Sequence, residues 1–249
     1  MQYELGKISL TGNRSENQDR AEIISAGPST LLIVVDGMGG HSGGARASEA
    51  TINRISALFR SRGQPVIDPQ GFLTMALTEA HAELVALGQD IAIEARPRAT
   101  CAVSLIQDGI LYAAHIGDSR IYHLRNRAVL SRSRDHSHVE LLLHEGVIKE
   151  AEVKDHPMRN YVECCLGGDD SLPDMSIAGR ARLVEGDVVL LCSDGFWTGI
   201  EEDALGALTA AGDSFESALI DLANAAVKHN EPSSDNTSVA AALYTGPGS

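Results

Sequence analysis

The sequence of 249 residues is poor in basic residues. Lysine and arginine number 20 against 34 aspartates and glutamates, which leaves a formal net charge of −14 at pH 7. The one dense basic stretch, Arg125 to Arg134, is short and interrupted. A strongly negative surface repels the phosphates of nucleic acids and the headgroups of anionic membranes. We therefore expect neither nucleic acid nor membrane as a partner.

Disulfide-forming and export features are also scarce. The four cysteines (Cys101, Cys164, Cys165 and Cys192) show no CxxC spacing, which is typical of reduced thiols rather than of a disulfide framework. No apolar run approaches the roughly 20 residues of a membrane helix. The N-terminus has neither the basic nor the apolar region of a secretory signal. These absences predict a cytoplasmic protein.

The chain does have enough apolar residues, 43%, to bury one good core, which favours a single domain. Strand-like runs come in blocks that helix-like segments interrupt, a pattern typical of α+β rather than of alternating architecture. The predicted strands cover 3–10, 20–25, 31–35, 100–106, 110–116, 120–124, 176–183, 188–192 and 237–244. The predicted helices cover 45–60, about 69–93, 201–210 and 214–228, with a short one near 139–144.

Three of the predicted strands follow one another closely between residues 100 and 124. Their connectors, Gln107-Asp-Gly and Gly117-Asp-Ser, are rich in residues that favour tight turns. We expect an antiparallel β-meander, in which Asp118 would be an ordinary turn residue.

Four aspartates stand at the ends of apolar strands. Asp36 follows a continuous aliphatic run, Asp194 follows another, Asp118 lies in a turn, and Asp235 lies just before the last strand. An aspartate beside glycine is usually only a turn residue, but a carboxylate at a buried strand end is costly unless it is paired. Four such positions therefore indicate a cation site, and hard oxygen ligands suit Mg²⁺ or Mn²⁺ better than zinc.

A loop between the first two strands carries one arginine and one further carboxylate, Arg14 and Asp19. An arginine in such a loop is most often a surface charge. Beside a metal cluster, however, its planar guanidinium could hold a phosphoryl group with two parallel hydrogen bonds. Arg14 is therefore a candidate phosphate-binding residue.

Five motifs, in this order, resemble those of the PPM (type 2C) protein phosphatases in their bacterial form. They are Arg14-x-x-Asn17-Gln18-Asp19, Val35-Asp36-Gly37-Met38-Gly39-Gly40-His41, Gly117-Asp118-Ser119-Arg120, Ser193-Asp194-Gly195 and Asp235-Asn236-Thr237. The resemblance extends from about Leu5 to Leu243, and Asp135-His136-Ser137 resembles the start of that family's flap. It implies a four-layer α-β-β-α sandwich with two antiparallel sheets flanked by helices. It also implies one phosphatase domain over 1–249, with an inserted flap at about 135–173.

The resemblance further implies a set of metal ligands for two Mn²⁺ or Mg²⁺ ions. Asp36 would bridge both ions, and the Gly37 carbonyl would bind the second. Asp194 and Asp235 would complete the protein ligands of the first. Asp118, together with Asp194, would hold a third and weaker ion.

Further roles follow from the same resemblance. Asp19 and Thr100 would orient metal-bound water, and Arg14 would hold the substrate phosphate. A hydroxide that bridges the two metals would then attack phosphoserine or phosphothreonine in line, without a protein nucleophile. The expected partners are phosphorylated proteins, including a bacterial Ser/Thr kinase that the enzyme opposes and that kinase's targets. We expect the protein to be a monomer.

Two of the departures from the family pattern bear on the chemistry of the site. Gln18 stands where many members carry glutamate, which removes one charge near the second metal. Met38 stands where eukaryotic relatives place a histidine proposed as the general acid. His41 could replace that histidine, but a surface or packing role is equally compatible with the sequence.

Two other classes of protein compete with this interpretation. A dinucleotide-binding protein fits poorly, since the glycines at 37–40 lack the third glycine of GxGxxG and Asp36 would repel a pyrophosphate. A non-catalytic relative that binds phosphoproteins for regulation remains the alternative. Loss of metal-binding aspartates would mark it, and the chain retains them.

Overall fold

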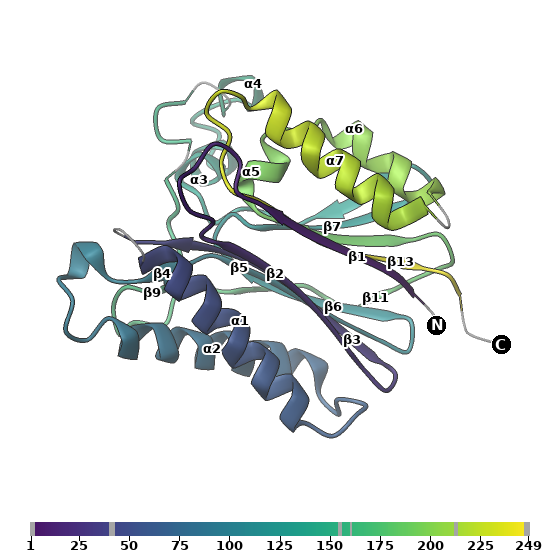
Figure 1. Cartoon of the computed structure of the whole chain (residues 1–249), viewed down its shortest axis with the longest axis horizontal. Coiled ribbons are helices and arrows are strands. Elements are labelled where there is room, and N and C mark those ends of the chain that lie inside the picture. The colour runs from purple at the N-terminus through teal and green to yellow at the C-terminus, as the bar shows by residue number, and fades with distance from the viewer. Residues whose placement is uncertain (1–2, 40–42, 154–155, 160, 212–213, 247–249) are drawn as a thin grey trace.

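The computed structural model describes residues 3–39, 43–153, 156–159, 161–211 and 214–246. Within them, the strands form two antiparallel sheets that lie face to face (Figure 1). The first sheet has five strands in the order β1 (Tyr3–Leu10), β13 (Thr237–Tyr244), β12 (Val188–Cys192), β7 (Arg120–Arg125) and β8 (Ala128–Arg132). The first and last strands of the chain therefore pair with each other, which closes the domain.

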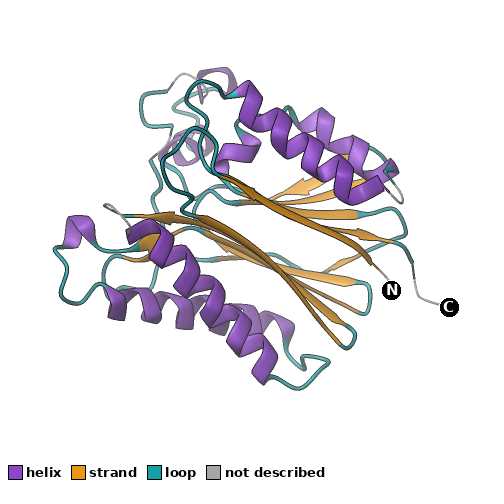
Figure 2. Cartoon of the chain, viewed as in Figure 1, coloured by secondary structure: helices purple, strands orange, loops and turns teal. Residues whose placement is uncertain are grey.

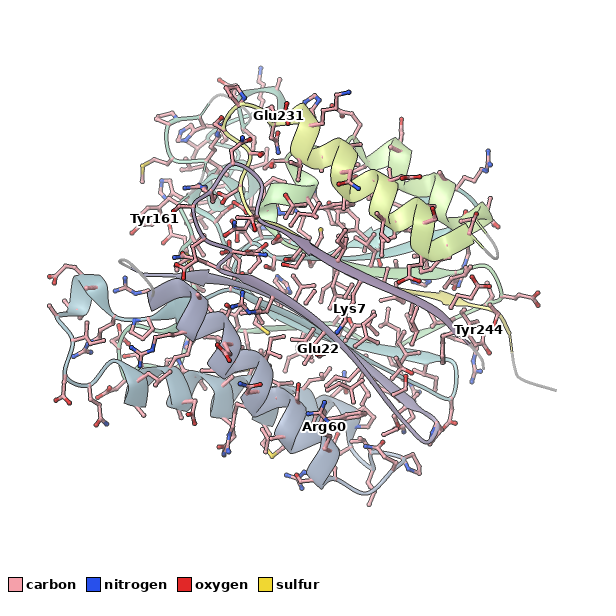
Figure 3. The ribbon with its side chains drawn as sticks, in the orientation of Figure 1. Lys7, Glu22, Arg60, Tyr161, Glu231 and Tyr244 are labelled. Atoms are coloured by element: carbon pink, nitrogen blue, oxygen red, sulfur yellow. The ribbon has the colours of Figure 1, made fainter. Side chains whose placement is uncertain are left out.

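The second sheet contains eight of the described strands. Its path runs β10 (Ser176–Ile177), β6 (Ile110–Ile116), β5 (Cys101–Gln107), β3 (Ser29–Met38), β4 (Arg98–Ala99) and β9 (Leu166–Gly167), with β2 (Asp19–Ala26) also on β3 and β11 (Ala181–Arg182) also on β6. Lys7 of β1 forms an ion pair with Glu22 of β2, and Figure 3 shows the two side by side. This pair links the edge strands of the two sheets.

Helices cover the outer face of each sheet (Figure 2). The second sheet carries α1 (Gly43–Ser61) and α2 (Pro69–Leu87), and the first carries α5 (Asp194–Trp197), α6 (Glu202–Leu205) and α7 (Phe215–His229). The expected four-layer α-β-β-α arrangement is confirmed. In the described part of the chain, no helix has both the length and the apolar character that a membrane crossing requires.

The three apolar clusters of the core follow from these layers. One lies between the second sheet and α1 and α2, one between the two sheets, and one between the first sheet and α7. β3 contributes to two of them: Leu31, Ile33 and Val35 face the helices, while Leu32 and Val34 face the other sheet. Because successive side chains of a strand point to opposite faces, a strand buried on both faces has to be aliphatic throughout. β3 is therefore held rigidly up to Asp36.

The expected three-stranded meander is wrong at its second connector. β5 and β6 form an antiparallel hairpin, but β7 pairs with β12 and β8 in the other sheet. Gly117 has φ 94°, and a Cβ there would lie 2.6 Å from Thr100 Cβ. Turn residues specify that the chain reverses locally, but not which sheet it joins next. Asp118 therefore lies where the chain crosses from one sheet to the other.

Two further boundaries differ from the prediction. α2 ends at Leu87, and Gly88 caps it, so that residues 93–95 form a separate 3₁₀ turn instead of the last turn of a long helix. The run 176–183 contains two short strands, β10 and β11, rather than one. The apolar pattern continued past both breaks, but it did not show where the backbone changes direction. The short helix expected near 139–144 is confirmed as α3 (His138–His144).

Candidate metal centre

A pocket of about 450 Å³ opens where the ends of the central strands of both sheets meet. Every predicted metal ligand and the predicted phosphate-binding arginine lie in its wall, whereas Asp19 and Thr100 do not. The lining residues are Arg14, Ser15, Glu16, Gln18, Asp36, Gly37, Met38, Asp118, Val162, Asp194, Asp235 and Asn236. The structure therefore gathers carboxylates that lie up to about two hundred residues apart in the sequence.

Strand register places these carboxylates together. Asp36 lies near the end of β3, where it faces Asp19 of β2. β12 and β13 run antiparallel, so Asp194, which follows β12, and Asp235, which precedes β13, stand at the same edge of the first sheet. The end of β3 comes very close to α1, since a Cβ on Gly44 would lie 2.5 Å from the backbone oxygen of Gly37. Glycine at position 44 is therefore what allows the helix to start against the pocket.

The carboxylates of the pocket are electrostatically unfavourable without a cation. Desolvation by the surrounding protein, followed by the neighbouring carboxylates, raises the pKa of Asp36 and of Asp194 well above the ordinary value. The same leading cause raises the pKa of Asp19 to about 6 and that of Asp118 to about 7. Buried like charges disfavour ionisation. A bound cation would reverse this effect by stabilising the ionised form.

Arg14 and Asp235 form an ion pair at the mouth of the pocket. Arg14 Nη2 donates to Asp235 Oδ2 at 2.6 Å, and the N–H of Asn236 donates to Asp235 Oδ1 at 2.8 Å. Asp235 raises the pKa of Arg14 through this hydrogen bond. In this structure Asp235, a predicted metal ligand, is therefore bonded to Arg14, the predicted phosphate-binding residue.

The donor set fits a hard divalent cation, although the ligands do not yet enclose one. The wall offers carboxylate and carbonyl oxygens with no cysteine or histidine among its lining residues, as expected for Mg²⁺ or Mn²⁺. Across the residues that the structure describes, no group of three or more His, Cys, Asp or Glu side chains is arranged to hold a metal ion.

Asp19 and Thr100 lie behind the wall and support it. Asp19 accepts a hydrogen bond from Ser193 Oγ at 2.6 Å, immediately before Asp194. The backbone N–H of Thr100 donates to the backbone oxygen of Asp36 at 2.9 Å, and the side-chain hydroxyls of Thr100 and Ser119 are 2.7 Å apart. Both residues therefore connect elements that carry predicted ligands.

Two residues that sequence reasoning left without a role also shape the pocket. Asn236 accepts from the Gln18 N–H at 2.8 Å and donates to the oxygens of Thr11 and Glu16, so it holds the loop that carries Arg14. The amide side chain directly after Asp235, in Asp235-Asn236-Thr237, was the available sequence signal for this role. Val162 reaches the wall from the predicted flap, and nothing in its local sequence indicates that position.

The departures from the family pattern lie in or near the same pocket. Gln18 and Met38 line it, and Gln18 Nε2 donates to Glu16 Oε2 at 3.2 Å. His41 lies outside the described residues, so its possible role as a general acid stays a prediction.

Comparison with known proteins agrees with this geometry. Residues 9–244 match the family described as protein phosphatase 2C. The protein phosphatase PhpP of Streptococcus pneumoniae is 32% identical over 185 residues, which cover 73% of this chain and 74% of that protein.

Solved structures show the same fold. The serine/threonine phosphatase of S. agalactiae superposes with a TM-score of 0.88 at 25% identity, over 98% of this chain and 100% of that one. The catalytic domain of the serine/threonine protein phosphatase PstP, in complex with two manganese ions, gives a TM-score of 0.81 at 24% identity, over 98% of this chain and 99% of that one. At that identity, the second likeness concerns the fold alone.

Proposed function

The chain belongs to the protein phosphatase 2C family and is a protein-serine/threonine phosphatase, and we propose that it hydrolyses phosphoserine and phosphothreonine with the help of two Mn²⁺ or Mg²⁺ ions. The observation that carries this proposal is the meeting of Asp36, Asp118, Asp194 and Asp235 in one pocket with Arg14. The raised pKa values of Asp36, Asp118 and Asp194 and the oxygen donors of the four aspartates are what a site for divalent cations needs.

Residues of both sheets would share the ions. Asp36 would lie between the two, the Gly37 carbonyl would serve one, and Asp194 and Asp235 would serve the other. Asp118 would hold a third, weaker ion together with Asp194. When bound, the ions would supply Lewis acidity, which activates water as the nucleophile and offsets charge on the phosphoryl oxygens.

Arg14 has a second partner in this scheme. Its guanidinium is bonded to Asp235 in the structure, and each side chain keeps access to solvent, 58% and 37% exposed respectively. If Asp235 turns toward a cation, Arg14 is released to bind the phosphate of the substrate with two parallel hydrogen bonds. The ion pair would thus keep Arg14 oriented until the site is loaded.

A cysteine nucleophile is a poor alternative. Cys101 and Cys192 are fully buried, and burial raises the pKa of each thiol well above its ordinary value. Desolvation also raises the pKa of Cys164 and of Cys165. Since the thiolate is the reactive form and none of the four thiols lines the pocket, water is the nucleophile that the site favours. The four free thiols also fit the cytoplasm as the working compartment.

The whole chain, 1–249, would act as one phosphatase domain with 135–173 as a flap. Ser137, near the start of this segment, forms a β-bridge with Val162, and Val162 lines the pocket. Tyr161, which precedes Val162 in the chain, is 52% exposed, and Figure 3 shows it at the left of the molecule. The flap would contact the protein substrate, which could be a Ser/Thr kinase or one of its targets, bound to a monomeric enzyme.

Metal dependence tests the proposed function. Chelation is expected to abolish the hydrolysis of a phosphothreonine peptide, and Mn²⁺ or Mg²⁺ to restore it. Asp36→Asn removes the carboxylate that would serve both ions and should nearly eliminate turnover. Full turnover in excess chelator, by protein in which no metal is detected, would contradict the proposal.

One observation favours the alternative, a relative that binds phosphoproteins without hydrolysing them. Among the described residues no metal-binding group is closed, and Arg14 and Asp235 are paired with each other. Such a protein would bind a phosphothreonine peptide with the same affinity in chelator and in Mn²⁺, and would not hydrolyse it in either.

A further inference from the structure

The pairing of β7 with β12 ends two residues short of both Asp118 and Asp194. β7 and β12 pair antiparallel, and their last pair at this end is Arg120 with Cys192. Asp118 lies two residues before Arg120, in the crossing between the sheets, and Asp194 lies two residues after Cys192, at the start of α5. Beyond the last ladder pair, the pairing of β7 with β12 no longer sets the separation of the two carboxylates.

Trp197 makes the contact that closes this gap. It lies three residues after Asp194, about one turn along α5, and its Nε1–H donates to the Asp118 backbone oxygen at 3.0 Å. One end of the contact therefore belongs to the helix that begins with Asp194. The other end is the peptide of Asp118 itself.

Arg120 holds the indole ring in place. Its guanidinium carbon lies 3.5 Å from the centre of the Trp197 ring, a geometry that favours a cation–π interaction. Arg120 Nε and Nη2 also donate to the two Asp135 carboxylate oxygens, at 2.9 and 2.7 Å. These side chains of Arg120 and Asp135 are only 12% and 6% exposed. The ring is thus fixed on its face by Arg120 and at its edge by Asp118.

The residue after Asp135 secures the other side of the crossing. The His136 N–H donates to the Gly117 oxygen at 2.9 Å, and the Gly117 N–H donates to His136 Nδ1 at 3.3 Å. Because Nδ1 accepts, Nε2 carries the proton of the neutral ring and donates to Ser176 Oγ at 2.8 Å. Gly117, which precedes Asp118, is therefore bonded through both its N–H and its backbone oxygen to His136, near the start of the flap.

We propose that Trp197, held by Arg120 and Asp135, is a positioning residue that sets the separation of Asp118 and Asp194 and thereby the affinity of the weaker cation site. This inference rests on the proposed function. It adds that the first residues of the flap support the metal centre from behind. We term the Arg120–Trp197–Asp118 set the bracket.

The bracket has a built-in reporter, because Trp197 is the single tryptophan of the chain. Trp197 is hydrogen-bonded to Asp118 and lies on the helix that begins with Asp194, so its emission should respond to a cation held by these two residues. Titration of Mn²⁺ is therefore expected to quench tryptophan emission in a weak phase that follows the filling of the two tighter sites. Asp118→Asn should remove the weak phase and leave the tight one.

Two sets of variants test the bracket. Trp197→Phe keeps an aromatic ring for Arg120 and removes only the N–H donor. The double variant Arg120→Gln/Asp135→Asn keeps a neutral hydrogen-bonding pair and the tryptophan. Loss of a group that orients metal ligands typically costs about 10–100-fold in metal affinity or activity. We therefore expect the affinity of the weak site for Mn²⁺ to fall about tenfold in both variants. Calorimetry would measure it for Trp197→Phe, and quenching of tryptophan emission would measure it for the double variant.

Kinetics should separate positioning from general damage. On a phosphothreonine peptide, both variants should lower kcat with little change in KM, and the loss should be smaller on an activated aryl phosphate. Arg180→Gln, which replaces an exposed arginine between β10 and β11, is the control and should match the wild type. Circular dichroism and the tight metal phase should remain unchanged if the variants are folded.

The outcomes are distinguishable. Normal weak-site affinity and normal kcat in both bracket variants, with a wild type that is active and metal-dependent, would overturn the positioning role alone. A loss of the tight phase together with the weak one would also overturn it, since the effect would then be a general loss of structure. A wild type that binds no metal and hydrolyses no phosphopeptide would overturn the proposed function itself.

Discussion

Strand β12 has one aspartate directly before its first residue and another two residues after its last, and the two are held in opposite ways. Asp187 precedes the strand, and its side chain has no exposure to solvent. It accepts hydrogen bonds from Arg125 Nε and Nη2, both at 2.7 Å, from His123 Nε2 at 2.9 Å and from the Val184 N–H at 2.9 Å. Asp194, at the other end, faces mainly other carboxylates.

The pKa values of the two residues shift in opposite directions. Burial by itself would raise the pKa of Asp187, but hydrogen bonds from Arg125 and from the Val184 N–H outweigh it, so the pKa lies below its ordinary value. Burial and neighbouring carboxylates together raise the pKa of Asp194. Burial acts in the same direction on both carboxylates, so the neighbouring groups decide their roles. Hydrogen-bond donors let Asp187 stabilise the fold as an anion, whereas neighbouring carboxylates make Asp194 a candidate cation ligand. Substitutions at the two ends of β12 should therefore affect different properties, turnover at the Asp194 end and stability of the fold at the Asp187 end.

The largest expected effect is on turnover, from Asp194→Asn. The substitution removes a negative charge that would hold cations, and loss of several kcal/mol of charge stabilisation corresponds to a decrease in kcat of roughly 10³-fold. The same change relieves repulsion in the metal-free pocket, so stability in chelator should be equal or higher. Steady-state kinetics and urea unfolding would check both. A variant that is less stable and fully active would contradict the comparison.

Asp187→Ala should show the reverse pattern. Removing one partner of a buried ion pair leaves Arg125 and His123 without their acceptor, and such a loss typically costs about 3–5 kcal/mol of unfolding free energy. Turnover per folded molecule should not change, because Asp187 is at the opposite end of β12 from the pocket. Urea unfolding measures the first quantity, and kcat corrected for the folded fraction measures the second. Asp187→Asn, which keeps one acceptor oxygen, is the matched control with a smaller loss.

Arg14→Ala sharpens the comparison at the mouth of the pocket. Arg14 is exposed and paired with Asp235, unlike Arg125, which is bonded to a fully buried carboxylate. The variant should keep the stability of the wild type and raise KM for a phosphothreonine peptide by about tenfold, since it removes a substrate contact. An additional decrease in kcat would show that the contact strengthens in the transition state. An unchanged KM would show that Arg14 does not bind the substrate phosphate and only pairs with Asp235.

The smallest expected effect is a pH dependence of stability at the Asp187 end. A group whose pKa is lowered by folding contributes stability that is complete above its unfolded pKa of about 3.9 and is lost as the pH falls through the folded value. The difference in unfolding free energy between the wild type and Asp187→Asn should therefore be largest near pH 6 and shrink below about pH 4. Urea unfolding at several pH values would measure it. A difference that stays constant down to pH 2.5 would show that ionisation of Asp187 contributes little.

Much of the fold could be predicted because the signals are local. The aliphatic run before Asp36 predicted a strand buried on both faces, and β3 is one. The pairing of β1 with β13 could not be predicted from either strand, since it depends on residues at opposite ends of the chain. The crossing at Gly117–Ser119 was mistaken for a hairpin, because a turn sequence does not specify the sheet that follows.

The candidate site divides in the same way. The sequence by itself determined that carboxylates would stand at strand ends and that their oxygens would suit a hard cation, because residue type and strand pattern are local properties. Only the tertiary structure decided that Arg14 pairs with Asp235, 221 positions away in the chain, and that Trp197 supports Asp118. It also decided that Asp187 meets an arginine while Asp194 meets other aspartates, because the charge state of a buried group depends on which distant residues the fold packs against it.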